Sequence, residues 1–364
     1  MQDRLERTQA QLRAQGCAGL FVGASSDLRW LLGYHALPLE RLTLLVLPAE
    51  GPGHLVVPEL EMPRAAASGA GELVDLQPWS ETDDPFALVD RLVDAAGADR
   101  AGRWAVQDQL WTSFTLSLQA SLPQASWERG SEVTGPLRIR KTPAEVAALR
   151  AVGAAIDEVH AAVPGLLRAG RTEMEVGRDI AERILVDHDE VNFVIVASGP
   201  NGASPHHETG NRVLEEGDAV VVDIGGTMDG YCSDETRNYA IGHAPDGYDQ
   251  MHRVLEAAQA ASVASVRPGV TAASIDAAAR DVLEDAGYGQ WFVHRTGHGV
   301  GVDAHEPPWI VGGNEQLVEP GMAFSIEPGV YVPDRHGARI EDIVVVTDDG
   351  VESLNLQPHE LTVA

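Results

Sequence analysis

The sequence predicts an α+β protein with an N-terminal α/β domain and a C-terminal domain made of two similar halves. The chain has 364 residues, which exceeds one typical domain. Helix and strand patterns alternate up to about residue 136, and a strong helix start follows at Thr142. Beyond that point, two long segments of the chain resemble each other. We therefore expect domains over residues 1–136 and 142–364.

The N-terminal domain is predicted from local hydrophobic patterns. Strand-like apolar runs occupy residues 18–24, 41–48 and 53–58, and the segment RWAVQD adds a further strand. Helical patterns occupy residues 3–15, 59–67 and 85–96. Pro63 would interrupt the second of these helices, because proline lacks a backbone N–H. This alternation is typical of an α/β domain.

The start of the second domain is marked by three residues that agree with one another. Thr142 is a predicted helix N-cap, Pro143 sits at the first helical position and Glu145 completes a capping box. A helix therefore begins here, and with it a new structural unit.

The second domain contains an internal duplication. RAGRTEMEV (168–176) matches RPGVTAASI (267–275), and each segment opens a helix. LEEGDAVVVDIG (214–225) lines up with VEPGMAFSIEPG (318–329). A chance likeness of two helix-strand units is the alternative, but the acidic residues also fall at matching positions.

The duplication pairs four carboxylates. Asp223 falls opposite Glu327, and in the strands that follow, Asp234 falls opposite Glu341. Asp223 comes after the apolar run Ala219–Val222, and a carboxylate at the end of a buried strand is costly without a partner. If the halves pack face to face, the four carboxylates converge in one cleft.

Four converging carboxylates require cations, because they cannot all stay ionised unaided. Oxygen-rich clusters suit hard divalent ions, and an added imidazole shifts preference toward manganese, zinc, cobalt or iron. His298 supplies that imidazole, and the flanking Gly297 and Gly299 would let the backbone come close to a ligand. We therefore expect a pair of metal ions held by Asp223, Asp234, His298, Glu327 and Glu341.

Composition excludes several classes of function. The net charge of −29 argues against binding to nucleic acid, which needs clustered Lys and Arg. The two cysteines, Cys17 and Cys232, form no disulfide framework or thiolate zinc site. The N-terminus is a charged amphipathic helix rather than a signal peptide, and no apolar run reaches membrane-spanning length. A soluble cytoplasmic protein is expected.

Five segments resemble the metal-ligand motifs of the M24 "pita-bread" metallopeptidases: VVDIGG, YCSDETR, RTGHGVG, IEPGVY and RIEDIVVV. Their order and approximate spacing also fit, and the likeness spans the whole second domain. The first domain resembles the N-terminal domain of the creatinase/prolidase branch. The resemblance thus implies a creatinase-like domain before a pseudo-symmetric pita-bread domain, and a Xaa-Pro peptidase of the prolidase or aminopeptidase P kind.

The resemblance also implies a role for each ligand. Asp223 would chelate one metal ion, while Asp234 and Glu341 would bridge two. His298 and Glu327 would complete the site of the other ion, and Glu327 would act as the general base. Manganese is the first expectation, with cobalt, zinc or iron as alternatives.

Three more histidines match family positions. His206 would face the substrate, and we prefer it to His207 because it directly follows Pro205, as in the family. His294 and His305 would stabilise the tetrahedral intermediate or the leaving nitrogen. For one histidine alone, a polar surface or core role would be the better interpretation.

Substrate contacts are assigned to four further residues. Tyr331 and Arg339 sit at family positions, although Arg339 fits equally well as the neutraliser of a ligand carboxylate. A prolidase must also bind the carboxylate that follows proline, which needs a cation, usually Arg. Arg41 or Arg295 is expected to do this. A solvated strand-end residue is an equally good interpretation of Arg41.

The sequence therefore predicts a metal-dependent Xaa-Pro dipeptidase acting on small peptides with proline in second position, expected as a homodimer. Aminopeptidase P activity on longer peptides and a broader M24 aminopeptidase are alternatives. From other classes, a metal-free creatinase-like hydrolase or a non-catalytic peptide-binding protein stays open. All five ligand positions carry metal-competent residue types, which favours hydrolysis.

Overall fold

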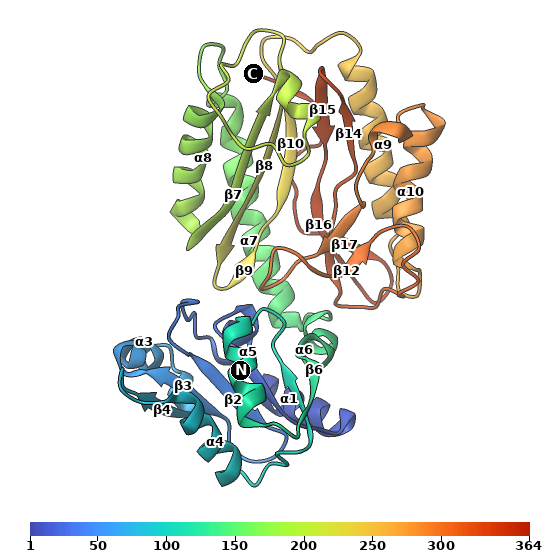
Figure 1. The fold of residues 1–364 in the computed structure, drawn as a ribbon. Coiled ribbons are helices and arrows are strands. Elements are labelled where there is room, and N and C mark those ends of the chain that lie inside the picture. Colours follow the sequence, from blue (N-terminus) through green and yellow to red (C-terminus); the bar gives the residue numbers. More distant parts are fainter. The chain divides into compact units, whose positions relative to one another are not determined.

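The computed structural model describes residues 1–364 and divides them into two compact units, Met1–Arg138 and Ile139–Ala364 (Figure 1). Both units combine helices with sheets, so the predicted α+β class is confirmed. Pro136 lies inside helix α6 (Ser131–Arg138), and the first unit therefore ends with that helix rather than at the proline.

The N-terminal unit is built on one six-stranded sheet in the order β4-β3-β2-β1-β5-β6. The pairs β1–β2 and β2–β3 are antiparallel, and the other pairs are parallel. Its strands are β1 (Cys17–Gly23), β2 (Leu44–Pro48), β3 (His54–Pro58), β4 (Asp75–Trp79), β5 (Arg103–Val106) and β6 (Ser126–Arg129). Besides α6, its helices are α1 (Gln2–Gln15), α2 (Ser26–Leu32), α3 (Met62–Ala67), α4 (Pro85–Ala95) and α5 (Thr112–Ser121).

The helix expected over residues 59–67 is divided in two. A 3-10 turn (Glu59–Glu61) precedes α3, and Pro63 lies in the first turn of α3. The first N–H groups of a helix have no intrahelical partner, so proline is tolerated there and does not interrupt the helix.

The C-terminal unit has two halves of similar construction (Figure 1). In the first half, α7 and α8 pack against a sheet in the order β18-β10-β8-β7, with β9 paired to β8. In the second half, α9 and α10 accompany a sheet in the order β12-β11-β13-β16-β17 and the hairpin β14–β15.

The bounds of these elements follow the chain. The first half contains α7 (Pro143–Ala162), α8 (Glu173–Asp187), β7 (Glu190–Ser198), β8 (Ala219–Met228), β9 (Tyr231–Cys232) and β10 (Glu235–Ala240). The second contains α9 (Tyr248–Ser265), α10 (Ala272–Asp285), β11 (Gly297–Gly299), β12 (Glu306–Ile310), β13 (Ala323–Ile326), β14 (Gly329–Val332), β15 (His336–Arg339), β16 (Asp342–Val346) and β17 (Val351–Ser353). The last strand, β18 (Thr362–Val363), returns to β10.

The helix starts predicted from the sequence are confirmed. Thr142 accepts a hydrogen bond from the backbone of Glu145, whose carboxylate accepts one from the backbone of Thr142 at 2.8 Å. Thr172 caps α8 with the same capping box, and Thr271 caps α10 at the matching position of the second half.

The two halves meet where β10 approaches the segment before β16. The backbone N–H of Glu341 donates to the carbonyl of Thr236, and Asn238 Nδ2 donates to the carbonyl of Arg339 at 2.7 Å. Residues of both halves that the duplication relates are thereby brought side by side.

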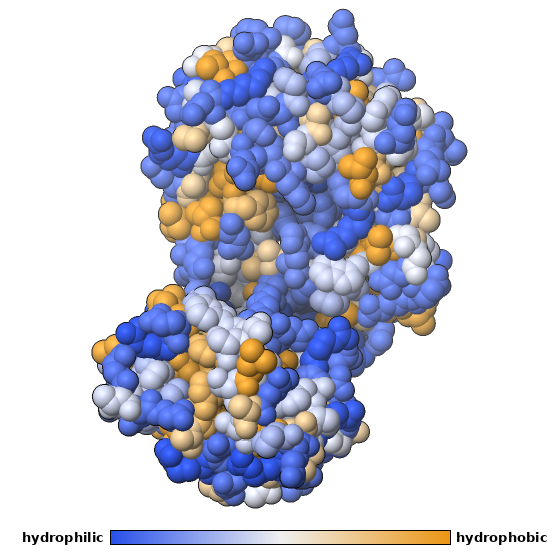
Figure 2. Space-filling model, in the orientation of Figure 1, coloured by the Kyte–Doolittle hydropathy of each residue, from blue (hydrophilic) through white to orange (hydrophobic).

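Hydrophilic residues cover most of the face seen in Figure 2, as the strongly acidic composition leads one to expect. None of the helices has both the length and the apolar character that crossing a membrane requires.

Candidate metal centre

The five predicted ligands come from both halves of the C-terminal unit. Asp223 lies within β8, and Asp234 directly precedes β10. His298 is the middle residue of β11, Glu327 directly follows β13 and Glu341 directly precedes β16. The expectation that the strand ends at Asp223 was wrong, because β8 continues through its pairing with β7 and β9 to Met228.

These side chains converge into two overlapping groups. Ligand atoms of Asp223, Asp234 and Glu341 lie within 4.8 Å of one another, and so do those of His298, Glu327 and Glu341. Asp223, Asp234, His298 and Glu341 are buried, and Glu327 is nearly so. The two groups share Glu341, so the residues could hold two neighbouring ions.

The electrostatics of the cluster favour a bound cation. Burial, followed by the charges of Glu341 and Asp223, raises the pKa of Asp234 well above its usual value. Burial and the charges of Glu327 and Asp223 do the same to Glu341. Ionised carboxylates this close repel one another, and a divalent ion would relieve that repulsion.

Glu327 differs from these two carboxyls. Burial works against its charged form, but the hydrogen bond from His298 and the charges of His298, His294 and Arg339 outweigh burial and lower its pKa to about 2. His298 Nε2 lies 3.1 Å from Glu327 Oε1 and 3.8 Å from Asp234 Oδ2. Glu327 is thus ionised near neutral pH and able to accept a proton.

Hydrogen bonds from neighbouring side chains orient Asp223. Thr236 Oγ1 lies 2.9 Å from Asp223 Oδ1 and 2.8 Å from Glu341 Oε2. Arg339 Nη2 donates to Asp223 Oδ2, and Arg339 Nη1 donates to the hydroxyl of Tyr331 at 2.9 Å. The interpretation of Arg339 as the neutraliser of a ligand carboxylate therefore has direct support.

The glycines beside His298 are required, but for a reason that the sequence did not suggest. A Cβ at Gly297 would lie 1.9 Å from the carbonyl oxygen of Ser325, and one at Gly299 would lie 2.2 Å from that of Pro307. The close approach is therefore to the backbones of β13 and β12 rather than to a ligand. The two flanking strands fix His298 in place.

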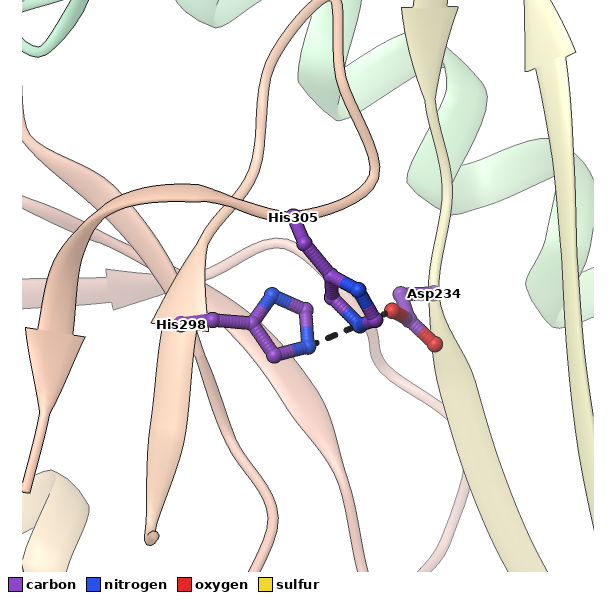
Figure 3. A group of neighbouring side chains, drawn as sticks. All are labelled: Asp234, His298 and His305. Atoms are coloured by element: carbon purple, nitrogen blue, oxygen red, sulfur yellow. Dashed lines mark ion pairs between the residues drawn. The ribbon is translucent and has the colours of Figure 1, made fainter. Parts of the chain in front are cut away.

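His305 lies beside the centre, as Figure 3 shows. Its ring meets that of His298 edge to face, with centroids 4.0 Å apart, and it groups with Asp234 and His298 within 4.8 Å. Partial desolvation and the neighbouring His298 lower the pKa of His305 to about 4. The proximity of this ring to Asp234 and His298 could not be predicted from the sequence.

The residue after His305 anchors its loop. Glu306 accepts a hydrogen bond from Lys141 Nζ at 2.8 Å, and both side chains are buried. Lys141 is the single lysine of the chain. This ion pair ties the loop to the residue before the N-cap of α7.

His294 is held from two sides. Its Nε2 lies 2.9 Å from the hydroxyl of Tyr331, and its Nδ1 lies 2.7 Å from the carbonyl oxygen of Arg295. Arg280 of α10 donates to the carbonyl of His294 at 3.0 Å. Burial is the main reason that the pKa of His294 is lowered.

His206 and His207 have different surroundings. His206 is exposed, and its charge contributes to lowering the pKa of both His294 and His305. His207 Nε2 instead lies 2.8 Å from Glu173 Oε2. His206 is therefore the one whose position relates it to the other two histidines.

The two candidate arginines also differ. The guanidinium of Arg295 lies over the ring of Trp309, 4.4 Å from its centroid, and forms no ion pair with a carboxylate. Arg41, in the N-terminal unit, forms ion pairs with Glu40 and Glu81. The charge of Arg41 is therefore already compensated.

The arrangement of a histidine and four carboxylates across two similar halves agrees with the comparisons to known families. Residues 147–348 match metallopeptidase family M24, and residues 4–140 match the creatinase/prolidase N-terminal domain. This chain belongs to metallopeptidase family M24. The fold and family predicted from the five motifs are thus confirmed.

Several relatives of this M24 metallopeptidase match it along nearly its whole length. It is 49% identical to the probable dipeptidase PepE of Mycobacterium tuberculosis over 99% of this chain and 96% of the relative. It is 32% identical to the Xaa-Pro dipeptidase of Lactobacillus delbrueckii subsp. lactis over 99% and 98%.

Solved structures share this fold along nearly the whole chain. The dipeptidase PepE of Mycobacterium ulcerans superposes with a TM-score of 0.92 at 50% identity, covering 99% of this chain and 97% of that one. The prolidase of Thermococcus sibiricus gives a TM-score of 0.92 at 32% identity, covering 99% and 98%.

Proposed function

We propose that this M24 metallopeptidase is a Xaa-Pro dipeptidase that depends on two divalent metal ions. The observation that carries the proposal is the convergence of Asp223, Asp234, His298, Glu327 and Glu341 in two groups that share one carboxylate. The names of its relatives, dipeptidase and Xaa-Pro dipeptidase, support the substrate class.

The donor set fits the metal ions that the family implies. Four carboxylates and one imidazole suit manganese, with cobalt, zinc and iron as alternatives. When bound, the ions would supply an activated water and polarise the scissile carbonyl. Asp223 would hold one ion, His298 and Glu327 the other, and Asp234 and Glu341 would serve both.

The chain's own residues handle protons and developing charge. Glu327, which stays ionised beside His298, would accept the proton of the attacking water. His305, with a pKa near 4, is neutral at pH 7 and would donate an N–H to the oxygen that becomes negative. Tyr331 holds His294 in one orientation, and His294 would stabilise the same negative charge as His305. His206 would face the substrate.

Recognition of a dipeptide needs a cation for the carboxylate that follows proline. Arg295 is the stronger candidate, because its guanidinium is stacked on Trp309 and has no acidic partner. Arg41 would first have to leave Glu40 and Glu81. We therefore assign carboxylate recognition to Arg295.

The test is hydrolysis of Ala-Pro, Ala-Pro-Ala and Ala-Ala, each with added manganese and with a chelator. Activity on Ala-Pro alone that is lost to chelator and restored by manganese supports a prolidase. Preference for Ala-Pro-Ala would instead indicate aminopeptidase P. Activity that survives complete metal removal, or none on any peptide, would overturn the proposal in favour of a creatinase-like hydrolase or a binding protein.

We further propose a homodimer located in the cytoplasm, which rests on the resemblance to the Xaa-Pro peptidases. Light scattering coupled to size-exclusion chromatography would give the mass of the assembly, to be compared with the 38.8 kDa of one chain. Fractionation of the source cells would test the location.

A further inference from the structure

Glu173, the first residue of α8, is a fully buried carboxylate outside the ligand set. Its Oε1 accepts hydrogen bonds from the backbone and hydroxyl of Ser198, at 2.8 and 2.7 Å, and from Asn201 Nδ2 at 2.9 Å. Its Oε2 lies 2.8 Å from His207 Nε2 and accepts from the backbone of Gly210 at 3.3 Å. All its partners border or belong to one loop, residues 199–210.

A buried charge is costly unless hydrogen bonds surround it. Burial alone would raise the pKa of Glu173, but the hydrogen bonds from Ser198, Asn201 and His207 outweigh burial and lower it. The carboxylate therefore stays charged, and a charged acceptor forms stronger hydrogen bonds than a neutral one. Five such bonds hold both ends of the loop to α8.

The opposite side of the same loop reaches the metal centre. The carbonyl of Pro205 accepts a hydrogen bond from Arg339 Nη1 at 3.2 Å, and Arg339 in turn binds Asp223. The next residue is His206, whose charge is felt by His294 and His305. The loop is thus fixed by Glu173 on one side and carries a histidine of the cleft on the other.

The second half of the unit contains a similar arrangement, although at a position that the duplication does not relate to Glu173. Asp276 of α10 is buried and accepts hydrogen bonds from the backbone and hydroxyl of Thr296, at 3.1 and 2.8 Å. It also pairs with Arg280, which donates to the carbonyl of His294. In each half, a buried carboxylate on the second helix holds a segment next to a candidate site histidine, His206 or His294.

We propose that Glu173 is a positioning residue that fixes the loop 199–210 so that His206 faces the substrate. The proposal rests on the peptidase function proposed above, because His206 is assigned to the substrate side. In this role Glu173 neither binds a metal ion nor transfers a proton.

The variant Glu173→Gln tests this with little change of shape. An amide keeps one acceptor oxygen for Ser198 and Asn201 but places an NH2 group opposite the N–H of Gly210. The matched control is Asp157→Asn, which makes the same change in a buried carboxylate of α7 that accepts from the backbone of Leu356 and does not touch the loop.

The first measurement is hydrogen–deuterium exchange together with metal content, which needs no substrate. We expect faster exchange in residues 199–210 of Glu173→Gln at unchanged metal stoichiometry, and wild-type exchange there in Asp157→Asn. Unchanged exchange in Glu173→Gln would overturn the proposal, even if the chain hydrolysed no peptide at all. If exchange is faster in Glu173→Gln but the wild-type chain hydrolyses no peptide, the peptidase function alone has failed.

The second measurement is a double-mutant cycle on kcat/KM. We expect Glu173→Gln to lower kcat/KM for Ala-Pro about tenfold, and to cause little further loss in a His206→Ala background, because the two changes affect one interaction. If the double variant loses kcat/KM by the product of the two single losses, Glu173 acts independently of His206 and the proposal is contradicted. Asp157→Asn should stay within about twofold of wild type.

Discussion

Two hydrogen bonds join Thr236 and Glu341 across the two halves of the C-terminal unit. The backbone N–H of Glu341 donates to the carbonyl of Thr236 at 3.3 Å, and the hydroxyl of Thr236 lies 2.8 Å from Glu341 Oε2. The same hydroxyl lies 2.9 Å from Asp223 Oδ1. The hydroxyl of Thr236 thus lies between two carboxylates, and its single proton can be donated to only one of them at a time.

The variant Thr236→Val should weaken metal binding about tenfold. A hydrogen bond to a charged group contributes about 1.5–3 kcal/mol, and losing it frees both carboxylates from a fixed orientation. Titration calorimetry of the metal-free protein with manganese measures the affinity. Thr236→Ser, which keeps the hydroxyl, is the control and should bind nearly as tightly. Equal affinity in Thr236→Val would show that the ligands orient themselves without it.

The variant Gly297→Ala should destabilise the protein by about 2 kcal/mol or more and impair metal binding. The new Cβ would collide with the carbonyl oxygen of Ser325, which forces β11 and β13 apart and moves His298. Thermal unfolding and metal content measure the two effects. Gly165→Ala, where nothing lies within 4 Å of the added Cβ, should behave like wild type.

The variant Arg295→Ala should lower kcat/KM for Ala-Pro by tenfold or more while affecting Ala-Pro-Ala much less. A charge-assisted contact to the dipeptide carboxylate is absent in the tripeptide at that position. Arg41→Ala is the comparison, and it should leave the ratio of the two rates unchanged because Arg41 is bound to Glu40 and Glu81. The opposite pattern in the two variants would assign carboxylate recognition to Arg41.

His160 and His252 should each lower the stability of the fold as the pH falls below about 6.5, whereas the raised pKa values of Asp234 and Glu341 act in the opposite direction. Burial, followed by the charge of Arg237, lowers the pKa of His160 to about 3, and burial lowers that of His252 to about 4. Between these values and 6.5 the unfolded chain binds more protons than the native one, so each imidazole removes about 1.4 kcal/mol of stability per pH unit.

Urea unfolding at pH 7, 6 and 5 measures this dependence. His160→Gln lacks one of the titrating groups and should show a shallower slope than wild type, whatever its stability at pH 7. Identical slopes would mean that His160 does not contribute to the loss.

The convergence of the four carboxylates could be predicted because the halves repeat. Duplication places Asp223 opposite Glu327 and Asp234 opposite Glu341, and matched positions on matched strands converge when the halves face each other. The environment of each ligand was not predictable, because it comes from segments far apart in the sequence. Thr236 orients Asp223 from the neighbouring strand β10, and Arg339 does so from β15 in the other half. The role of the glycines at His298 likewise depends on the neighbouring strands.

Glu173 shows why positioning residues are hard to find in a single sequence. An acidic residue directly after a threonine N-cap is already explained by the helix dipole, which favours negative charge in the first turn. Only the fold brings Ser198, Asn201, His207 and Gly210 around it. The ion pairs that Arg41 forms with Glu40 and Glu81 could likewise not be predicted from the sequence.

The ion pair between Lys141 and Glu306 has a practical consequence for handling this protein. Because the chain's only lysine is buried against a carboxylate, reagents that acylate primary amines meet no exposed ε-amino group. A fluorescent dye, a biotin ester or a resin that couples through amines should therefore leave every side chain of residues 1–364 unmodified as long as the protein stays folded.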